Sequence, residues 1–331
     1  MMINKNSPLA IFGAGSIGER HIQVLQSLGY NNIYVYRQRN LPLRQVDLST
    51  IKIFTDIAQI DEIRPVAAFI TSPTALHVEQ ALQCARKGIH VLIEKPLSNT
   101  LHGIEELNHL AKSNNLLVWI GYTLRFHPAF LKIKNIIDNK TFGKLQYFHT
   151  HWGEYLPHWH SWEDYKESYA ARKKLGGGVA LTLSHDIDII NWLLDDIPVK
   201  YSLSVQQDST MEIDVESAAD FICTYSSDIR GHIHLNFSQK IPFRTYHFTL
   251  EEAFIRFDYF ENELIIQTLD DKEVIHYSSF ERNDMFRDQT SAFFNTINSV
   301  ADLTPISRKN VNDAEVIIEM CAGLNDEKLW K

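Results

Sequence analysis

A chain of 331 residues with 44% hydrophobic and 22% charged side chains has the composition of a globular protein with one or two domains. Its net charge of −9 argues against a nucleic-acid surface, because phosphate binding needs a basic face. No apolar run approaches the roughly 20 residues that span a bilayer, and the N-terminus lacks the basic and apolar regions of a signal peptide. The three scattered cysteines favour buried thiols in a reducing compartment over disulfides or a zinc site. We therefore expect a cytoplasmic protein that binds neither nucleic acid nor a membrane.

A glycine-rich turn follows the first predicted strand. The apolar run Leu9–Phe12 leads into Gly13, Gly15 and Gly18, an amphipathic stretch comes next, and a second strand is expected at Ile33–Tyr36. In that setting the glycines let the backbone approach a pyrophosphate, which the positive end of the following helix attracts. The sequence therefore predicts a dinucleotide site with cofactor contacts at Gly13, Gly15, Ser16, Ile17 and Gly18.

Arg37 stands where sites that prefer NAD usually carry an acidic residue for the adenosine ribose hydroxyls. A guanidinium cannot accept those hydrogen bonds, but its charge and its forked donors suit a 2′-phosphate. Arg39 lies just beyond it. The pattern slightly favours NADP over NAD. The alternative is that both arginines are solvated loop charges and that NAD binds through backbone contacts.

Strand and helix patterns alternate over residues 1–123. Helical patterns follow Thr71 and cover 101–113, and in the first of them Ser72 is expected to be the N-cap and Pro73 the first helical residue. Further strands are expected near Ile51–Phe54, Ala67–Thr71, His90–Glu94 and Leu117–Gly121. Such alternation predicts an α/β Rossmann domain, a doubly wound parallel sheet with ligands beyond the carboxyl ends of its strands. We place this NAD(P)-binding domain at residues 1–123.

After Lys144 the apolar pattern becomes alternating, as in strands with one polar face. Strands are expected over 221–225, 229–237, 244–250, 253–259, 263–268 and 273–277, and helices over 284–299 and 313–324. This pattern predicts a C-terminal α+β domain at 124–331, with an open, mostly antiparallel sheet for substrate binding and oligomerisation.

One face of that sheet is expected to be covered by a second copy of the chain. The helices of this half can cover only one face, and the other face includes the polar residues His232, His234 and Asn236. Neighbouring strands are expected to add the aromatic residues Tyr246, Phe248, Phe257 and Tyr259 to the same face. A face this apolar should not stay exposed, so we expect sheet-to-sheet packing in a homodimer or homotetramer.

The segment from His149 to Arg172 is rich in aromatic and histidine side chains. Aromatic rings with interspersed hydrogen-bonding groups can stack on sugar faces and bind hydroxyls, and the basic run Arg172–Lys174 can hold a carboxylate or phosphate on the sugar. The alternative is a loop between domains whose aromatic rings pack on the sheet. His149 and His151 would share a strand face, but no third ligand is readable, so no metal is expected.

Several motifs together carry a specific family resemblance. Besides the glycine turn they are Thr71-Ser72-Pro73, Glu94-Lys95-Pro96, Arg125-Phe126-His127-Pro128, and Gly176-Gly177-Gly178 followed by His185-Asp186-Ile187-Asp188. With this set, which extends from about residue 8 to 195, the chain resembles the glucose-fructose oxidoreductase, inositol dehydrogenase and MocA-like family. The resemblance implies a Rossmann domain and a substrate domain built on an open antiparallel sheet, with nicotinamide between them.

The resemblance also implies that Lys95 touches the reacting hydroxyl and that His185 acts as acid or base. When a carbinol is oxidised, an imidazole can take the proton from oxygen while a lysine ammonium stabilises the developing alkoxide. Further cofactor contacts are expected at Arg37, Thr71, Ser72, Pro73, His77, Glu94 and Lys95. Substrate contacts are expected at Arg125, Tyr155, Trp162, Tyr169, Arg172, Thr182 and Asp188.

Leu181 departs from the family pattern, which usually has an Asp four residues before the histidine, where it can orient the imidazole. Asp186, Asp188 and Glu154 are the acids that could serve instead, or the chemistry is altered. The leading hypothesis is an NAD(P)-dependent oxidoreductase acting at a secondary alcohol or ketone of a sugar or sugar derivative, including acidic or nucleotide-linked sugars of glycan biosynthesis. The alternatives are a non-enzymatic NAD(P)-binding sensor or regulator, and an enzyme that retains its cofactor and performs elimination, hydrolysis or epimerisation.

Overall fold

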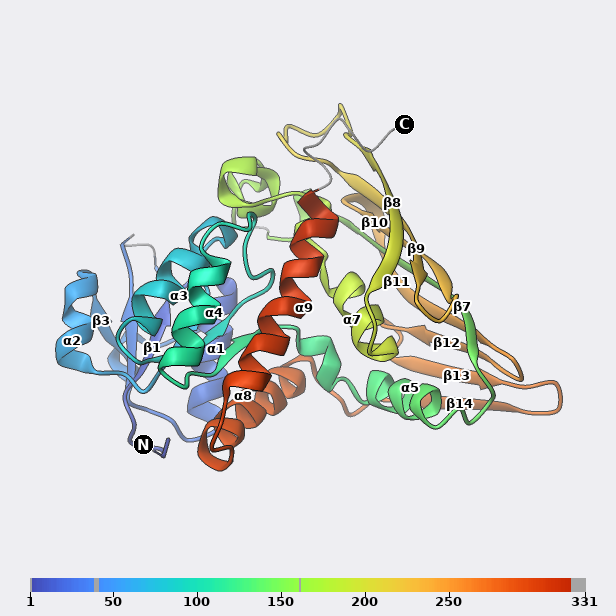
Figure 1. Ribbon diagram of the computed structural model, residues 1–331. Coiled ribbons are helices and arrows are strands. Elements are labelled where there is room, and N and C mark those ends of the chain that lie inside the picture. Colours follow the sequence, from blue (N-terminus) through green and yellow to red (C-terminus); the bar gives the residue numbers. More distant parts are fainter. Residues whose placement is uncertain (1, 39–41, 161, 323–331) are drawn as a thin grey trace. The chain divides into compact units, whose positions relative to one another are not determined.

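The computed structural model describes residues 2–38, 42–160 and 162–322, and its contacts divide the chain into two compact units (Figure 1). Unit 1 combines residues 1–123 with 281–315, and unit 2 combines 124–280 with the residues from 316 onward. This division differs from the predicted boundary, which placed all of 124–331 in one domain. The reason is packing: the ring centres of Phe293 and Phe294 lie 5.9 and 6.0 Å from that of Phe69, in the core of unit 1.

Unit 1 contains a six-stranded parallel sheet of order β3-β2-β1-β4-β5-β6, as the sequence predicts. Its strands are β1 (Leu9–Phe12), β2 (Ile33–Tyr36), β3 (Lys52–Phe54), β4 (Ala67–Ile70), β5 (His90–Ile93) and β6 (Val118–Ile120). Its helices are α1 (Ser16–Ser27), α2 (Ile60–Ile63), α3 (His77–Ala85), α4 (Ile104–Ser113), α8 (Arg282–Ser299) and the first part of α9 (Thr304–Ala322). Residues of β1 are fully buried because helices cover both faces of the sheet.

A hydrogen-bonded contact fixes the start of α9 on unit 1. The hydroxyl of Ser307 donates to the carbonyl of Leu116 at 2.7 Å and accepts from the backbone N–H of Val118 at 3.1 Å. The C-terminal part of the sequence thereby completes the core of the N-terminal unit.

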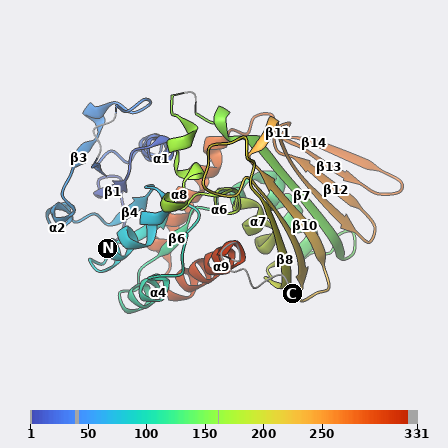
Figure 2. The same ribbon diagram turned by 90° about the horizontal axis from the view of Figure 1, so that it is seen from above.

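Unit 2 contains an eight-stranded sheet of order β14-β13-β12-β11-β7-β10-β9-β8, and Figure 2 shows these strands side by side. All neighbours are antiparallel except β7 and β10, so the predicted open, mostly antiparallel sheet is confirmed. Its strands are β7 (Leu145–Tyr155), β8 (Pro198–Gln206), β9 (Ala218–Tyr225), β10 (Arg230–Asn236), β11 (Ser238–Leu250), β12 (Phe254–Asp258), β13 (Glu263–Gln267) and β14 (Lys272–His276). The helices of this unit are α5 (Pro128–Asp138), α6 (Val179–Thr182), α7 (His185–Leu194) and the last part of α9, from Val316.

Short 3-10 turns complete the described elements. They lie at Leu48–Thr50, Ile57–Gln59, Thr74–Leu76, Thr123–Phe126, Leu156–His158, Tyr165–Glu167, Tyr169–Ala171 and Lys173–Leu175. No helix in the part of the chain that the structure describes is long and apolar enough to cross a membrane.

The two faces of the unit 2 sheet differ from the prediction. Tyr246 and Phe257 lie on the covered face, where the ring of Phe130 in α5 packs 4.7 and 5.2 Å from theirs. Phe248 alternates with His247 and so shares that face, and Tyr259, next to Arg244, does too. The prediction that these four aromatic residues join His232 on the other face is therefore wrong, because the register of β11 pairs His247, not its aromatic neighbours, with His149.

Candidate active site

The three glycines of the turn between β1 and α1 have different surroundings, which the position of a Cβ added to each one shows. Gly13 has φ +98°, and a Cβ there would lie 3.1 Å from the backbone of Ser72. A Cβ on Gly18 would lie 2.2 Å from the carbonyl oxygen of Gly13, so α1 packs against the turn without side-chain atoms. A Cβ on Gly15 would meet nothing within 4 Å. The turn is therefore tightly packed at two glycines and faces open space at the third, beside the N-terminus of α1.

Thr71 connects this turn to the end of β4. Its hydroxyl donates to the carbonyl oxygens of Gly13 at 2.8 Å and Phe12 at 3.1 Å. The next residues do not cap a helix as predicted: the hydroxyl of Ser72 donates to Gln80 at 2.7 Å, and Pro73 precedes a 3-10 turn that leads into α3. Ser72 and Pro73 thus lie at the edge of the turn, and α3 begins further along the chain, at His77.

Arg37 lies directly after β2, half-buried, with its backbone N–H donating to Phe54 at 3.1 Å. Arg39, the second basic residue of the prediction, lies outside the described residues. Arg44 and Gln45 are bonded to α1. The buried carboxylate of Glu19 in that helix accepts hydrogen bonds from their backbone N–H groups, at 2.8 Å from Arg44 and 2.6 Å from Gln45. Sequence reasoning missed Glu19, which carries no motif signal.

Lys95 follows β5 at the same edge of the sheet, half-buried, and its peptide bond to Pro96 is cis. The preceding carboxylate of Glu94 is buried and lies 2.7 Å from Nε2 of His21 in α1. Burial raises the pKa of Glu94, but the hydrogen bond and charge of His21 together with the charges of Lys95 and His77 lower it, and the pKa lies below its ordinary value. His77 is buried as well, with both ring nitrogens 2.8 Å from backbone carbonyl oxygens, those of Pro96 and Ser72. Glu94 and His77 therefore make their described hydrogen bonds with other groups of the protein.

In unit 2 two of the three glycines before α6, Gly177 and Gly178, lie close to other chain segments. A Cβ on Gly177 would lie 2.4 Å from the carbonyl oxygen of Tyr169. Gly178 has φ +111°, and a Cβ there would lie 2.4 Å from a carboxylate oxygen of Glu216. That carboxylate accepts from the N–H of Ala180 at 3.1 Å, and burial raises its pKa. The motif thus fixes the path of the chain into α6 and α7, and Glu216 is a residue that sequence reasoning missed.

His185 is the first residue of α7 and is half-buried. Asp188, one turn along the helix, is buried and forms a bidentate ion pair with Arg125. Nε of the arginine donates to Oδ2 at 2.9 Å, and Nη2 donates to Oδ1 at 2.5 Å. Thr182 of α6 is buried too. The structure therefore pairs the predicted residue Arg125, in the 3-10 turn Thr123–Phe126, with Asp188 on the helix that begins with His185.

Asp186 does not take the place of the acid that Leu181 replaces. Its Oδ1 accepts from Nη2 of Arg244 at 2.5 Å and from the hydroxyl of Tyr246 at 2.6 Å, all in the interior. Burial lowers the pKa of Arg244, but the charge and hydrogen bond of Asp186 together with Tyr246 and Tyr259 raise it, and the net shift is upward. The guanidinium also lies 3.5 Å from the ring centre of Trp152.

Trp152 is an aromatic residue of the 149–172 segment that lies near His185. Its ring centre is 6.3 Å from that of His185, and its indole N–H donates to Glu154 at 2.7 Å. Of the three alternative acids, Glu154 is thus connected to His185 through the indole, whereas Asp186 and Asp188 are paired with arginines. Side chains alternate between the two faces of β7, so the sequence pattern could have placed Trp152 on the opposite face from His149 and His151.

The other predicted substrate contacts lie at the end of β7 and on the segment that follows it, and two of them pack against nearby histidines. Tyr155 packs against His158 with ring centres 4.7 Å apart, and the half-exposed Trp162 packs against His160 at 4.8 Å. Tyr169 supplies the carbonyl against which Gly177 packs.

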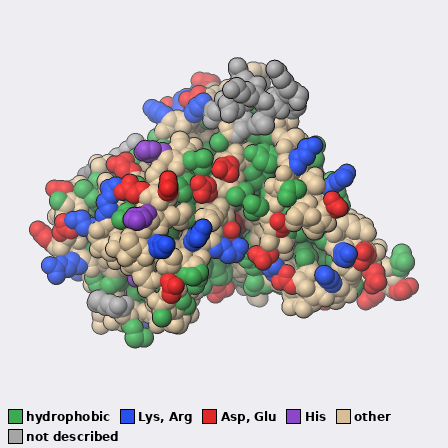
Figure 3. Space-filling view, viewed as in Figure 1, with side chains coloured by type: hydrophobic (Ala, Val, Ile, Leu, Met, Phe, Trp, Pro, Cys, Tyr) green, Lys and Arg blue, Asp and Glu red, His purple; other side chains and the backbone are tan. Residues whose placement is uncertain are grey.

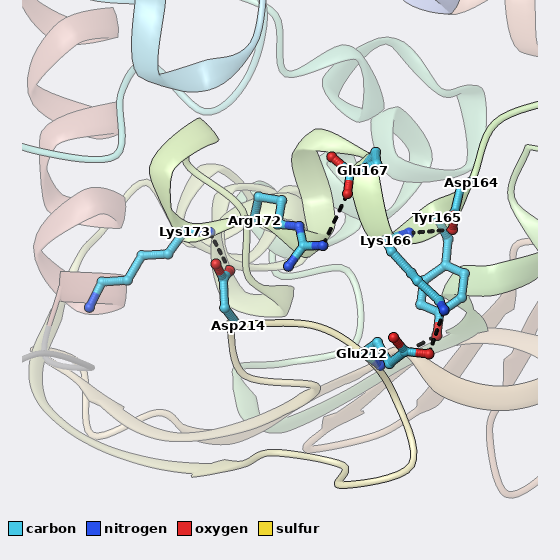
Figure 4. Close-up of polar contacts among 8 residues, drawn as sticks. All are labelled: Asp164, Tyr165, Lys166, Glu167, Arg172, Lys173, Glu212 and Asp214. Atoms are coloured by element: carbon cyan, nitrogen blue, oxygen red, sulfur yellow. Dashed lines mark hydrogen bonds and ion pairs between the residues drawn. The ribbon is translucent and has the colours of Figure 1, made fainter.

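Arg172 belongs to a set of ion pairs on this segment (Figure 4). Its guanidinium points at Glu167, 3.3 Å away, and Lys166 points at Glu212. The backbone N–H of Lys173 donates to Asp214 at 2.7 Å, while the side chain of Lys173 extends away from it. The segment is therefore tied to residues 212–214 by charge, and its arginine already faces a carboxylate.

Histidines cluster on the open face of the sheet. His149 and His232 stack with ring centres 5.2 Å apart, and His151 and His234 lie 4.7 Å apart. Across residues 2–38, 42–160 and 162–322, no group of three or more His, Cys, Asp or Glu side chains is placed to hold a metal ion. On the face drawn in Figure 3, acidic and basic side chains are interspersed.

Two family models match the chain. The model of the oxidoreductase family with an NAD-binding Rossmann fold matches residues 8–122, and that of the GFO/IDH/MocA C-terminal domain matches residues 130–256. Among curated relatives, myo-inositol 2-dehydrogenase of Thermotoga maritima is 29% identical over 140 residues, which are 41% of this chain and 42% of that protein. The chain spans about half the length of the curated relatives it matches, or somewhat less.

Solved structures share the fold over nearly the whole chain. UDP-N-acetylglucosamine 3-dehydrogenase of Acidithiobacillus ferrooxidans has a TM-score of 0.78 at 17% identity and covers 98% of this chain and 97% of its own. Levoglucosan dehydrogenase in complex with NADH has a TM-score of 0.80 at 16% identity, with coverage of 96% and 97%. At these identities the likeness shows the fold alone.

Proposed function

The chain belongs to the Gfo/Idh/MocA family of oxidoreductases, and we propose that it transfers a hydride between a nicotinamide dinucleotide and a secondary alcohol or ketone of a sugar or sugar derivative. The observation that carries the proposal lies within unit 1. The glycine turn after β1 and Lys95 after β5 stand at the same carboxyl edge of one parallel sheet, where such sheets bind ligands. The family membership and the named dehydrogenases among the relatives support it.

The residues of unit 1 fit a dinucleotide. The open space at Gly15 and the first N–H groups of α1 at Ser16 and Ile17 suit a pyrophosphate, and Thr71 holds the turn in place. A bound nicotinamide would supply the hydride acceptor or donor. Arg37 favours NADP, since its guanidinium can pair with a 2′-phosphate.

The proton chemistry falls to Lys95 and His185. In the oxidative direction the ammonium of Lys95 donates a hydrogen bond to the substrate oxygen and stabilises negative charge as it develops there. The imidazole of His185 takes the hydroxyl proton, and in the reductive direction it returns that proton to the carbonyl oxygen. Together these two groups keep the reacting oxygen from carrying a full charge.

The ion pairs of unit 2 favour neutral hydroxyl groups over an acidic substrate. Arg125 is paired with Asp188, and Arg172 faces Glu167, so each of these guanidinium groups already has an internal carboxylate. A substrate carboxylate would have to displace one of them. Polyols and neutral sugars are therefore the substrate class that we favour, with nucleotide-linked sugars as the second class to test.

The test is to incubate the purified protein with NAD or NADP and a panel of polyols, sugars and nucleotide-linked sugars while following nicotinamide absorbance. Substrate-dependent reduction supports the proposal. Tight cofactor binding with no turnover of any compound would favour a sensor. Conversion of substrate without net change in absorbance would favour an enzyme that retains its cofactor.

We also propose that the open face of the unit 2 sheet packs against a second copy of the chain. Ile222 is 61% exposed there and Phe254 is 40% exposed, which supports an association surface around the histidine cluster.

A further inference from the structure

His77 lies between the two loops that carry the chemistry of unit 1. It is the first residue of α3, is 1% exposed, and has Nδ1 2.8 Å from the carbonyl oxygen of Pro96 and Nε2 2.8 Å from that of Ser72. Ser72 follows β4 and Pro96 follows β5, and these two strands are neighbours in the sheet. One buried side chain thus joins both loops.

The bridge belongs to a longer series of hydrogen bonds around the edge of the sheet. Thr71, next to Ser72, is bonded to the glycine turn, and the carboxylate of Glu94 accepts from the N–H of Lys95 at 3.3 Å. The residues on both sides of Lys95 are therefore anchored, Glu94 to α1 through His21 and Pro96 to the β4 loop through His77.

We infer that His77 is a positioning residue, which holds Lys95 at a fixed place relative to the nucleotide-binding loop and acts on the reaction only through Lys95. This inference rests on the proposed function for its kinetic readout. It assigns His77 no contact with cofactor or substrate, because its two ring nitrogens face backbone carbonyls in the interior. A small displacement matters here, since a misplacement of about 1 Å can reduce a rate by about 100-fold.

The ring chemistry makes the bridge testable in steps. An imidazole that carries both protons donates to both carbonyls, whereas a neutral one donates to one of them. His77→Gln keeps an amide N–H₂ for one carbonyl, and His77→Leu removes every hydrogen-bonding group of the side chain at similar volume. We expect kcat to fall in this order, by about 10-fold and about 100-fold, with the cofactor dissociation constant changed less than about threefold.

The decisive measurement is the same substitution in a Lys95→Ala background. If His77 acts through Lys95, His77→Leu causes no further loss of kcat there. An equal loss in both backgrounds would overturn the inference, since a general structural defect does not depend on Lys95. So would a loss of cofactor affinity as large as the loss of kcat.

His90 offers a matched control at the other end of the same strand. It is half-buried at the start of β5 and accepts a hydrogen bond from the N–H of Leu117 at 3.0 Å. His90→Gln should change the melting temperature about as much as His77→Gln and leave kcat unchanged. A fall in kcat for both variants would show that any weakened end of β5 has this effect, and would overturn the inference.

A readout without substrate separates this inference from the proposed function. The rate at which acetic anhydride acetylates Lys95 can be followed by peptide mass spectrometry, with the exposed Lys112 of α4 as internal reference. We expect the Lys95 rate relative to Lys112 to change several-fold in His77→Leu and less in His77→Gln. Unchanged ratios in both variants would reject the positioning role, whereas absence of turnover in wild type with changed ratios would reject only the proposed activity.

Discussion

His21 of α1 and Glu94 at the end of β5 form a buried pair, with Nε2 and Oε1 2.7 Å apart. The imidazole lies between the rings of Phe69 and Phe286, each 5.4 Å away. The helix that starts at the nucleotide turn is thus connected through one side chain to the residue before Lys95. Because the pKa of Glu94 lies below its ordinary value, the carboxylate stays ionised at neutral pH although it is buried.

This pair should be visible in the pH dependence of stability. A carboxyl group whose pKa is lowered by folding contributes stability above its unfolded pKa, near 4.5 here, and the contribution is lost as the pH falls through the lower folded pKa. We expect Glu94→Gln to be less stable than wild type at pH 7 and to show a smaller decrease in unfolding free energy below pH 4.5. Urea denaturation at several pH values measures both. Glu105→Gln, at an exposed position of α4, is the control, and a Glu94→Gln slope equal to that of wild type would contradict the assignment.

Two glycines of the turn should separate binding from folding. Gly15→Val places side-chain atoms in open space, so the protein should fold normally and lose cofactor binding. Gly18→Ala forces a Cβ against the backbone oxygen of Gly13, so we expect it to destabilise the fold by roughly 1–3 kcal/mol as well. Thermal unfolding and calorimetric titration of each variant distinguish the two outcomes. A Gly15→Val protein with wild-type cofactor affinity would place the dinucleotide elsewhere.

The sequence was sufficient for the nucleotide turn, because its glycines follow a short buried strand whose residues are all apolar. It was not sufficient for the partners of Glu94 and His77. A motif names residue types, but which atoms they face depends on α1 and on the neighbouring loop, which are distant in sequence. The Ser72 prediction failed because α3 begins only at His77, after the 3-10 turn Thr74–Leu76, and the Ser72 hydroxyl donates to Gln80, eight residues away.

In unit 2 the strands from β9 to β14 were predictable, whereas β7 and β8 were not among the expected strands, and the faces of the sheet were not predictable. Alternation shows that Tyr246 and His247 point to opposite sides, but it does not show which side α5 covers. Residues 281–315 illustrate the same limit for domain boundaries, since an amphipathic helix such as α8 shows that it packs on something without showing on which sheet.

Arg37 should decide the choice of cofactor. A charge-assisted bond to a 2′-phosphate contributes roughly 1.5–3 kcal/mol, so Arg37→Ala should weaken NADP binding about 10- to 100-fold and leave NAD binding nearly unchanged. Calorimetric titration of both cofactors into both proteins gives the four constants. Equal NADP affinities in wild type and variant would remove Arg37 from the site.

Lys95→Ala and His185→Ala should each lower turnover by about 100- to 10,000-fold with cofactor affinity nearly intact, because both groups act on the reacting oxygen. The pH dependence separates their roles. Loss of the imidazole should remove the titration of a proton carrier from the kcat profile, whereas Lys95→Ala should keep it. A His185→Ala protein with normal turnover at all pH values would exclude the histidine as the proton carrier.

The open face of the unit 2 sheet should mediate self-association. Its centre holds imidazoles, of which His149 is one whose pKa burial and the neighbouring histidines lower to about 4, so this residue is uncharged at neutral pH. Around it lie Ile222, 61% exposed, and Phe254, 40% exposed, and apolar side chains around an uncharged ring favour a partner surface over water. We expect wild type at micromolar concentration to have twice the 38.3 kDa mass of one chain, or four times it, by light scattering.

A charge placed on that face should separate the copies. Ile222→Asp puts a carboxylate into the proposed contact beside the histidines, where it would be desolvated, so the measured mass should fall to that of one chain with the melting temperature of unit 1 little changed. Leu48→Asp is the matched control, because Leu48 is 53% exposed and lies in unit 1. That variant should keep the wild-type mass. A single-chain mass for wild type, or an unchanged oligomer in Ile222→Asp, would show that this face remains in contact with solvent and that the apolar residues on it have another role.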